Sequence, residues 1–348
     1  MVAMAAARLD PRPAATAGEP GDRARAHAVL RAHGDHPSIA LAFHRDMRYE
    51  TAPGLDAVIP YRPAGRFLLA FGGVFGAEPD RRPLLERFVE AAERTGRRVC
   101  AVQVRDAAAD LFHRAGFRLN QLGCSYTLRL DGFRLAGGSF MQLRNKIRRA
   151  EATGIRAVEV GADVAAPPDL RQALDGVTRA WVRAKGRHQK VLEFLVGDLD
   201  ALARPGTRCF VALRDSALLA FITYVPVWGS RPGLLHDLSR RRPDCPPGVM
   251  ELVNSTAIRR FQAEGVGHLH FGFTPFAEVG RELGSHSPLV AALVRALARW
   301  GGAVYPAASQ VAYKRKWGPQ IVEPEYLAFR GRFRLGAVWQ LLRITRSI

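Results

Sequence analysis

The chain of 348 residues lacks the long apolar runs that mark membrane-spanning and secreted proteins. None of its runs approaches the roughly 18 residues that a membrane-spanning helix needs. The N-terminal stretch MVAMAAARLDPRPAATAGEP also has no continuous apolar core of the kind found in signal peptides. We therefore expect a cytoplasmic protein.

Cysteine is scarce and widely spaced. The four cysteines, Cys100, Cys124, Cys209 and Cys245, form no C-x-x-C pair. This spacing indicates neither a disulfide framework nor a zinc cluster. We expect buried free thiols and no bound metal.

Lysine is rare, although positive charge is abundant. Lys and Arg together number 51, yet the only lysines are Lys146, Lys185, Lys190, Lys314 and Lys316. The formal net charge of +19 predicts attraction to a polyanion, either nucleic acid or an anionic membrane surface. The alternative is that the charge serves solubility alone.

The length and the distribution of residue types predict two domains between flanking segments. Residues 1–21 are rich in Ala, Pro and Gly and predict a disordered arm. Residues 22–135 and 136–330 each combine short apolar strands with amphipathic helices, which predicts an α/β class with mixed, α+β sheets. Residues 331–348 predict a basic amphipathic helix that either docks on the core or lies on an anionic membrane.

Short apolar runs between Gly, Pro and polar residues predict the individual strands. Among them are IALAFH, AVIPYR, RFLLAFG, RRVCAVQV, CSYTLRL, RCFVALR, ALLAFITYVPVW, GLLHDL and HLHFGF. Helical spacing of apolar residues predicts helices in DRRPLLERFVEAAERTG, SFMQLRNKIRRAEATG, DLRQALDGVTRAWVRAKG, GVMELVNSTAIRRFQAEG and PLVAALVRALARW.

One run carries a specific family resemblance. HDLSRRRPDCPPGVMEL has the spacing D-L-x-R-x-x-P-x-x-P-x-G-x-M-[DE], and RNKIRRAEATGI, FGFTPFAEVG and YKRKWGP…EPEYLA support it in order. Over about residues 38–330 the chain resembles the catalytic domain of lysyl- and alanyl-phosphatidylglycerol synthases. It departs from that family at Gly73, where an Asp is usual, and between Pro319 and Pro324, where it is one residue longer and lacks the usual Trp.

The resemblance implies a tandem of two GNAT-like acyltransferase domains and an aminoacyl-tRNA-dependent transferase. It implies charged tRNA as co-substrate, no other cofactor, and either a soluble small molecule or phosphatidylglycerol as acceptor. The family's multi-span region does not precede the domain in this sequence, and soluble relatives acylate metabolites in natural-product pathways. The implied substrate-binding residues are Arg240, Glu251, Thr274 and Tyr313.

Catalytic roles are predicted for two of the rare lysines. If VAYKRKWGPQ is a β-strand, Lys314 and Lys316 point to one face, where a compact ammonium could stabilise charge developing on an ester. A guanidinium would not be equivalent there. The alternative is a solvated basic strand end.

Asp237 is the third predicted catalytic residue. At the end of a strand, it could orient the aminoacyl ammonium, accept a proton from the nucleophile, or pair with Arg240. The neighbouring His236 should face the opposite side of the strand, so we expect it to be structural.

Basic clusters predict the tRNA-binding surface, since phosphates attract Lys and Arg. They are Arg144, Lys146, Arg148 and Arg149 on one helix, and Arg241 and Arg242 in the loop that follows Asp237. A solvated helix face is the alternative for the first cluster.

Two glycine motifs bear on competing functions, a CoA-dependent N-acetyltransferase and a non-catalytic nucleic-acid-binding protein. QAEGVG fits the CoA pyrophosphate pattern, but it closes a predicted helix rather than opening one, so Gly265 should be a C-cap. GGVFG lacks the following Lys and Ser or Thr of a P-loop and predicts a tight turn.

Overall fold

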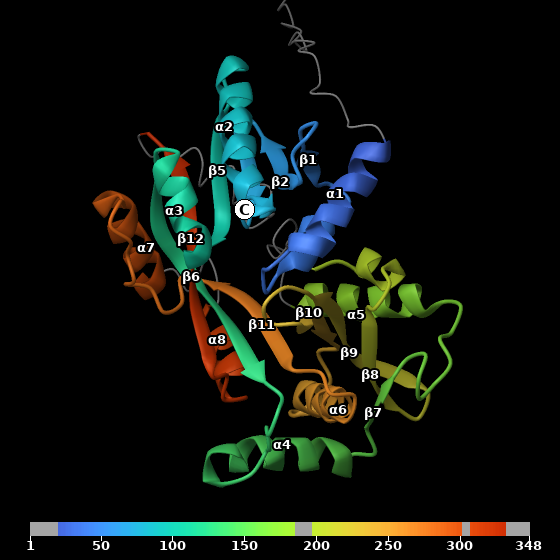
Figure 1. The fold of residues 1–348 in the computed structure, drawn as a ribbon. Helices are drawn as coiled ribbons and strands as arrows, with labels where there is room; N and C mark the ends of the chain where they lie inside the picture. Colours follow the sequence, from blue (N-terminus) through green and yellow to red (C-terminus); the bar gives the residue numbers. More distant parts are fainter. Residues whose placement is uncertain (1–19, 185–196, 301–306, 332–348) are drawn as a thin grey trace, which may run out of the picture.

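The computed structural model describes residues 20–184, 197–300 and 307–331 (Figure 1). Its strands are β1 (Arg48–Glu50), β2 (Ala57–Ala64), β3 (Phe67–Phe71), β4 (Phe75–Gly76), β5 (Arg98–Arg105), β6 (Phe117–Arg129), β7 (Arg156–Glu159), β8 (Arg208–Arg214), β9 (Ala217–Val227), β10 (Gly233–Arg241), β11 (His268–Pro275) and β12 (Ile321–Arg330). Its helices are α1 (Pro20–His33), α2 (Glu78–Arg94), α3 (Asp106–Arg114), α4 (Met141–Ala152), α5 (Leu170–Ala184), α6 (Val249–Ala263), α7 (Pro288–Trp300) and α8 (Ala307–Arg315). Short 3-10 helices are η1 (Ile39–Phe43), η2 (Gly138–Phe140) and η3 (Leu199–Ala203).

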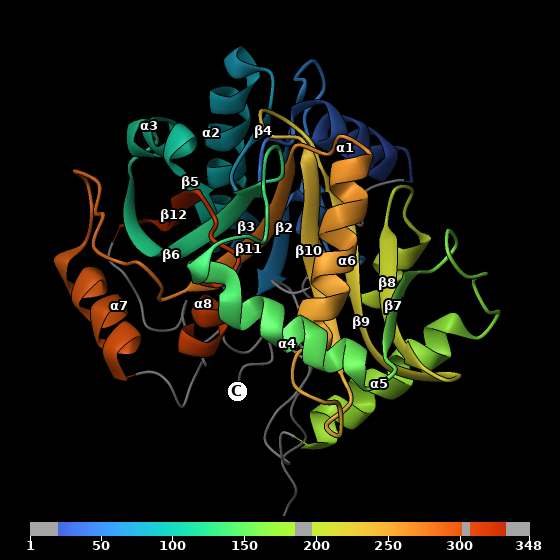
Figure 2. The same ribbon diagram turned by 90° about the horizontal axis from the view of Figure 1, so that it is seen from below.

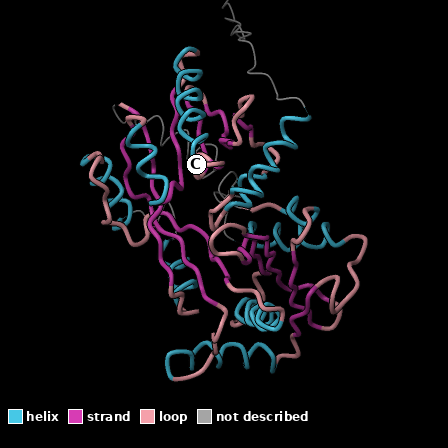
Figure 3. Tube along the Cα trace, in the orientation of Figure 1, coloured by secondary structure: helices cyan, strands magenta, loops and turns pink. Residues whose placement is uncertain are grey.

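The strands form one continuous mixed sheet in the order β1-β2-β3-β5-β12-β6-β11-β10-β9-β8-β7, and β4 pairs with β2 outside this path. The pairs β3–β5 and β10–β11 are parallel, and the other pairs are antiparallel. β12 comes late in the chain but lies between β5 and β6, which are labelled in Figure 1. Figure 3 shows the strands in magenta in the same orientation. The predicted mixed α/β class is confirmed, while the division into two units at residue 135 stays a prediction.

Helices cover both faces of the sheet. Because successive strand residues point to opposite faces, the residues that a helix contacts show which face it covers. In β8 and β9, Phe210 and Ile222 pack with residues of α4 and α6, whereas Val211 and Phe221 pack with residues of α5. α4 and α6 therefore cover the face opposite α5, and Figure 2 shows α4 crossing α6. At the other end of the sheet, α2 and α3 pack on one core and α1 on another.

Two predicted strands are helical. IALAFH forms the 3-10 helix η1, in which four of the five residues are buried; a short, fully apolar run does not distinguish a strand from a buried helical turn. VAYKRKW lies largely in α8, which begins at Ala307. Alanine favours a helix, so the residues before the run help to make it helical. CSYTLRL is the second half of the longer strand β6.

Several other predictions are confirmed by the backbone. α6 ends at Ala263, and Gly265 follows it with a φ of 76°, so QAEGVG closes a helix. Gly72 and Gly73 have φ values of 69° and 117° in a turn between β3 and β4. The four cysteines are free and buried. The predicted C-terminal helix lies outside the described residues, as does the predicted arm apart from its last two residues, which begin α1.

Within the described ranges, none of the helices is both long and apolar enough to cross a bilayer. Groups of three or more His, Cys, Asp or Glu side chains suited to hold a metal ion are likewise not found in this part of the chain.

Candidate active site

Lys314 is buried between α8 and the sheet. Its Nζ donates hydrogen bonds to the carbonyl oxygens of Gly272 (2.8 Å) and Phe273 (3.0 Å) and to Oγ1 of Thr274 (2.8 Å). An ammonium has three hydrogens, so these acceptors use all of them. The arrangement fastens α8 to β11 and leaves Lys314 no N–H for a substrate.

The surroundings of Lys314 shift the protonation of several groups. Burial lowers the pKa of Lys314 to about 7, and the nearby acidic groups of Cys124 and Glu325 act in the opposite direction. Burial raises the pKa of Glu325 to about 8, and this carboxyl accepts a hydrogen bond from the hydroxyl of Ser125. The hydrogen-bond geometry favours the ammonium form of Lys314, because each of its three acceptors needs a hydrogen.

Lys316 lies in a different environment. It is partly exposed, and its Nζ lies 2.6 Å from Oε1 of Glu251 and 4.0 Å from the ring centroid of Tyr313. Lys314 lies in the last turn of α8 and Lys316 in the turn after it, and their Nζ atoms have different partners, on β11 and on α6, so they do not line one site. The expectation that both lysines face one side was based on a strand and is wrong.

His236 lies on the same side of the sheet as Lys314. Its ring centroid is 5.5 Å from that of Tyr224, 5.8 Å from that of Phe271 and 5.7 Å from that of Tyr313. Burial, assisted by the positive charge of Lys314, lowers the pKa of His236 to about 3, so the imidazole is neutral at pH 7. This environment agrees with the structural role predicted for it.

Asp237 lies on the opposite side, toward α5. A β-bulge interrupts the pairing of β10 with β9 between His236 and Ser239, and Asp237 lies in it, next to Gly197 in the segment that leads into η3. A Cβ added to Gly197 would lie 2.1 Å from the Asp237 carboxylate oxygens, so this carboxyl fits only because residue 197 has no side chain. Burial raises the pKa of Asp237 to about 7, against the positive charge of Arg204.

Arg240 lies on the α5 side with Asp237. Its Cζ is 4.3 Å from the ring centroid of Trp181 on α5, and Nη1 donates to the carbonyl oxygen of Ser239 (2.7 Å). Burial lowers the pKa of Arg240 to about 10, while the charge of Asp237 opposes that shift. The guanidinium remains charged at neutral pH.

The residues predicted to line one site therefore fall into two groups. Asp237 and Arg240 lie toward α5, whereas the others lie on the face that α6 and α8 cover: Glu251, Thr274, Tyr313, Lys314 and Lys316. Only the first group has both partial exposure and a carboxyl that titrates near neutrality. We take Asp237 and Arg240 as the centre of the candidate active site.

The basic clusters lie near the beginning of α6. Lys146, Arg148 and Arg149 are exposed on α4, and a Cβ on Gly248 would lie 2.1 Å from the carbonyl oxygen of Lys146. α4 thus packs against the start of α6, which follows the exposed Arg241 at the end of β10 and the exposed Arg242 in the connection. Arg144 differs, because its Nη1 donates to the carbonyl oxygens of Leu135 (3.3 Å) and Gly137 (2.8 Å) and holds the preceding connection.

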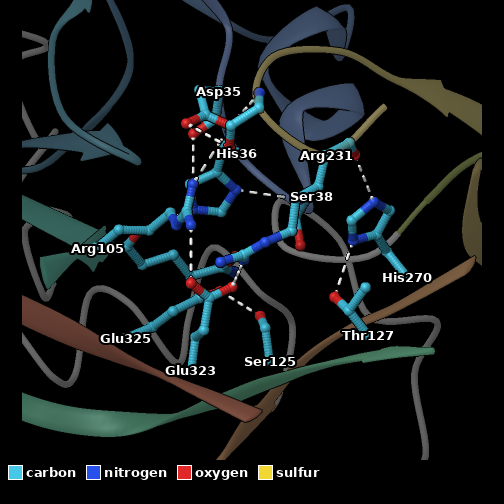
Figure 4. Close-up of polar contacts among 12 residues, drawn as sticks. Asp35, His36, Ser38, Arg105, Ser125, Thr127, Arg231, His270, Glu323 and Glu325 are labelled. Carbon is cyan, nitrogen blue, oxygen red and sulfur yellow. Dashed lines mark hydrogen bonds and ion pairs between the residues drawn. The ribbon is translucent and has the colours of Figure 1, made fainter. Parts of the chain in front are cut away.

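A polar network that the sequence did not indicate joins the two parts of the sheet (Figure 4). Glu323 on β12 lies 2.9 Å from Nη2 of Arg105 on β5 and 2.5 Å from Nη1 of Arg231 in the β9–β10 connection. Asp35, after α1, lies 3.5 Å from Arg105 and accepts hydrogen bonds from Ser230. Residues that bond directly to each other in it lie up to 218 residues apart in the sequence, as Arg105 and Glu323 do, so local patterns could not reveal it.

Buried histidines accompany this network. His36 Nε2 contacts the carbonyl oxygen of Gln103 (2.8 Å), and His270 contacts Oγ1 of Thr127 (2.9 Å) and the carbonyl oxygen of Arg231 (3.0 Å). Burial lowers the pKa values of His36 and His270 to about 3 and about 4. Neutral imidazoles can bridge backbone groups of different strands without adding charge to the interior.

Comparison with known proteins identifies relatives over most of the chain. The model of the family "Phosphatidylglycerol lysyltransferase, C-terminal" matches residues 27–329. The lysylphosphatidylglycerol biosynthesis bifunctional protein LysX of Mycolicibacterium gilvum is 27% identical over 308 residues, covering 86% of this chain and 27% of that protein. The phosphatidylglycerol lysyltransferase of Bacillus subtilis is 25% identical over 339 residues, covering 95% of this chain and 37% of that protein.

Solved structures share the fold. L-PGS from Bacillus licheniformis matches with a TM-score of 0.74 and 21% identity, covering 94% of this chain and 97% of that one. A C-terminal domain from Agrobacterium fabrum matches with a TM-score of 0.74 and 23% identity, covering 94% of this chain and 96% of that one.

Proposed function

The chain belongs to the family of phosphatidylglycerol lysyltransferase C-terminal domains, and we propose that it transfers an aminoacyl group from charged tRNA to a hydroxyl of phosphatidylglycerol. The chain spans 27% and 37% of the two curated relatives, so their complete activities are a proposal here. Both relatives are named for lysine and phosphatidylglycerol, which makes lysyl-tRNA the first donor to test.

The observation that carries this proposal is the placement of the Asp237 carboxyl against Gly197 and on the same side of the sheet as Arg240, where burial raises its pKa to about 7. A general base works best when its pKa lies near the working pH, because it is then both ionised and basic enough to take a proton. An ordinary surface Asp, with a pKa of about 3.9, is a much weaker base.

The proposed step balances as follows. The acceptor hydroxyl oxygen attacks the ester carbonyl carbon, and its proton passes to the Asp237 carboxylate. The tetrahedral intermediate then collapses, the bond to the ribose oxygen breaks, and that oxygen takes back the proton held by Asp237, which leaves a free hydroxyl on the tRNA and restores the carboxylate. Arg240, held against Trp181, supplies a positive charge beside Asp237 that favours binding of an anionic group such as a phosphate.

The donor would bind along the exposed cations of α4 and the following loop. Lys146, Arg148, Arg149, Arg241 and Arg242 are exposed and lie on segments that pack together at the start of α6. The acceptor stem of a tRNA is a polyanion, so neutralising several phosphates releases counterions and favours binding.

The test is transfer of radiolabelled lysine from lysyl-tRNA to vesicles that contain phosphatidylglycerol, measured as label extracted into organic solvent. Parallel reactions use alanyl-tRNA, a mixture of charged tRNAs, and acetyl-CoA as a donor of a different class. We expect labelled lipid with a charged tRNA and none with acetyl-CoA. Failure of every charged tRNA to label the lipid, in the presence of folded protein, would overturn the proposal.

A further inference from the structure

Helix α7 presents large apolar side chains to solvent. Leu289 is 83% exposed and Trp300 is 75% exposed, at opposite ends of the helix. In the described chain, Met141 on α4 is the other large apolar residue of this kind, at 53% exposure. Scattered exposed apolar residues are common, so the question is whether those of α7 form a continuous surface.

They do form a stripe. With 3.6 residues per turn, positions 289, 293, 296 and 300 lie within about 60° of one another around the helix axis. These positions are Leu289, Leu293, Ala296 and Trp300, each exposed or partly exposed. A different side of α7, containing Val290, Ala291 and Val294, is buried against the protein. The helix therefore has two apolar sides, and among the described residues only one of them packs against the protein.

Positive charge borders the outward stripe. Arg295 and Arg299 are exposed on α7, and the Cζ of Arg299 lies 5.7 Å from the ring centroid of Trp300. The sequence of α7, PLVAALVRALARW, contains no acidic residue. An apolar stripe bordered by arginine, with a Trp at its end, is the composition of helices that lie in the plane of a membrane interface.

The position of α7 leaves this stripe accessible. Both ribbon views place α7 at the margin of the molecule, away from α4 and α6 (Figures 1 and 2). The proposed tRNA-binding cations and the stripe therefore lie on different helices in separate parts of the surface.

We propose that the outward face of α7 docks the protein on an anionic phospholipid bilayer, with Leu289 and Trp300 entering the interface and Arg295 and Arg299 contacting the headgroups. The lipid role rests on the proposed function, which requires an acceptor held in a membrane. Charge complementarity favours a bilayer over a second copy of this chain. A symmetric contact between two copies of the stripe would bring their arginines close together, whereas anionic lipid would neutralise them.

The experiment is sedimentation of the full chain with vesicles of phosphatidylglycerol and phosphatidylethanolamine, compared with phosphatidylcholine vesicles. We expect binding to the anionic vesicles, and a loss of affinity of about tenfold or more in the double variant Leu289→Ser, Trp300→Ser. The matched control, Met141→Ser, removes the exposed apolar residue of α4 and should bind like the wild type.

A second pair of substitutions tests the charge while keeping the apolar stripe. Arg295→Gln with Arg299→Gln should weaken binding to anionic vesicles and leave the weak binding to phosphatidylcholine unchanged. Undiminished vesicle binding by both double variants would overturn the proposal. So would a wild-type dimer that the Leu289→Ser, Trp300→Ser variant converts to monomer without any change in vesicle binding.

The two proposals can fail separately. With a short-chain, water-soluble phosphatidylglycerol as acceptor, the α7 variants should transfer the aminoacyl group at the wild-type rate, and with vesicles they should be slower. If no acceptor is acylated but vesicle binding still depends on α7, the docking surface stands and the proposed function fails. Equal slowing with both acceptors would contradict a docking role.

Discussion

The two faces of the sheet around β9, β10 and β11 differ in how their ionisable side chains are hydrogen-bonded. On the face that α6 and α8 cover, Lys314 has three acceptors for its three hydrogens and serves to hold a helix on the sheet. On the face toward α5, Asp237 keeps partial exposure and a pKa of about 7. Both groups have shifted pKa values, so the shift alone does not identify the reactive one. The difference lies in the hydrogen-bonding capacity that each group has left for a substrate.

The largest expected effect is that of Asp237→Asn on the chemical step. Asparagine keeps the size of the side chain but cannot accept the proton, so single-turnover transfer should slow by about 10²-fold or more. Affinity for tRNA, measured separately, should change little.

The control for this variant is Asp244→Asn, since Asp244 is an exposed loop residue paired with Arg242. It should transfer at nearly the wild-type rate. A near-normal rate in Asp237→Asn would remove the distinction between the two faces.

Lys314→Arg should act on stability rather than chemistry. A planar guanidinium cannot direct its hydrogens to the three acceptors around Nζ and is too large for the buried space, so we expect a loss of about 2–4 kcal/mol in the free energy of unfolding. Urea denaturation measures this loss.

The matched substitution Lys316→Arg should cost less than Lys314→Arg, because Lys316 is partly exposed and its buried partner Glu251 can accept a hydrogen bond from a guanidinium. If the two variants were equally stable and Lys314→Arg alone lost transfer activity, Lys314 would belong to the reactive centre after all.

The pH dependence of the transfer rate tests whether Asp237 is the reactive group. A base must be ionised to act, so transfer should fall about tenfold for each pH unit below about 7 and level off above it. The residual activity of Asp237→Asn should lack this inflection. Measurement of single-turnover rates from pH 5.5 to 8.5 decides the point, since an unchanged inflection in the variant would assign it to another group.

Ionisation of the Asp237 carboxyl should raise the transfer rate but lower the stability of the fold. Because the pKa of Asp237 is raised above its usual 3.8, the folded protein binds more protons than the unfolded chain between that value and about 7. This group therefore lowers the free energy of unfolding as the pH rises through that window. The stability of Asp237→Asn minus that of the wild type should therefore be larger at pH 8 than at pH 4. Thermal unfolding of both proteins at the two pH values measures this difference.

The smallest effect is expected from substitutions on α4, which contains neither Asp237 nor Lys314. Replacing Arg148 and Arg149 by Gln should weaken tRNA binding and reduce the slope of log affinity against log salt by about 2. Arg144→Gln should leave that slope nearly unchanged, because Arg144 is bonded to backbone carbonyls. Equal slopes in all three proteins would mean that the helix is only a solvated basic face.

Local patterns in the sequence were sufficient for most elements and for the family. Periodic apolar residues predicted α2, α4 and α6, and the run from His236 to Leu252 carried the resemblance that the family match confirms. Such features depend on neighbours within a few turns of the chain, so no distant contact is needed to read them.

Only the tertiary structure decided how the candidate site is divided. The bulge at Asp237, the helix that contains Lys314, and the insertion of β12 between β5 and β6 set which side chains meet. VAYKRKW alternates like a strand, yet burial of Lys314 against carbonyl groups of β11 fixes it as part of a helix. Side chains that are far apart in sequence meet because packing and hydrogen bonding are satisfied together across the whole sheet, and a local pattern contains no record of those partners.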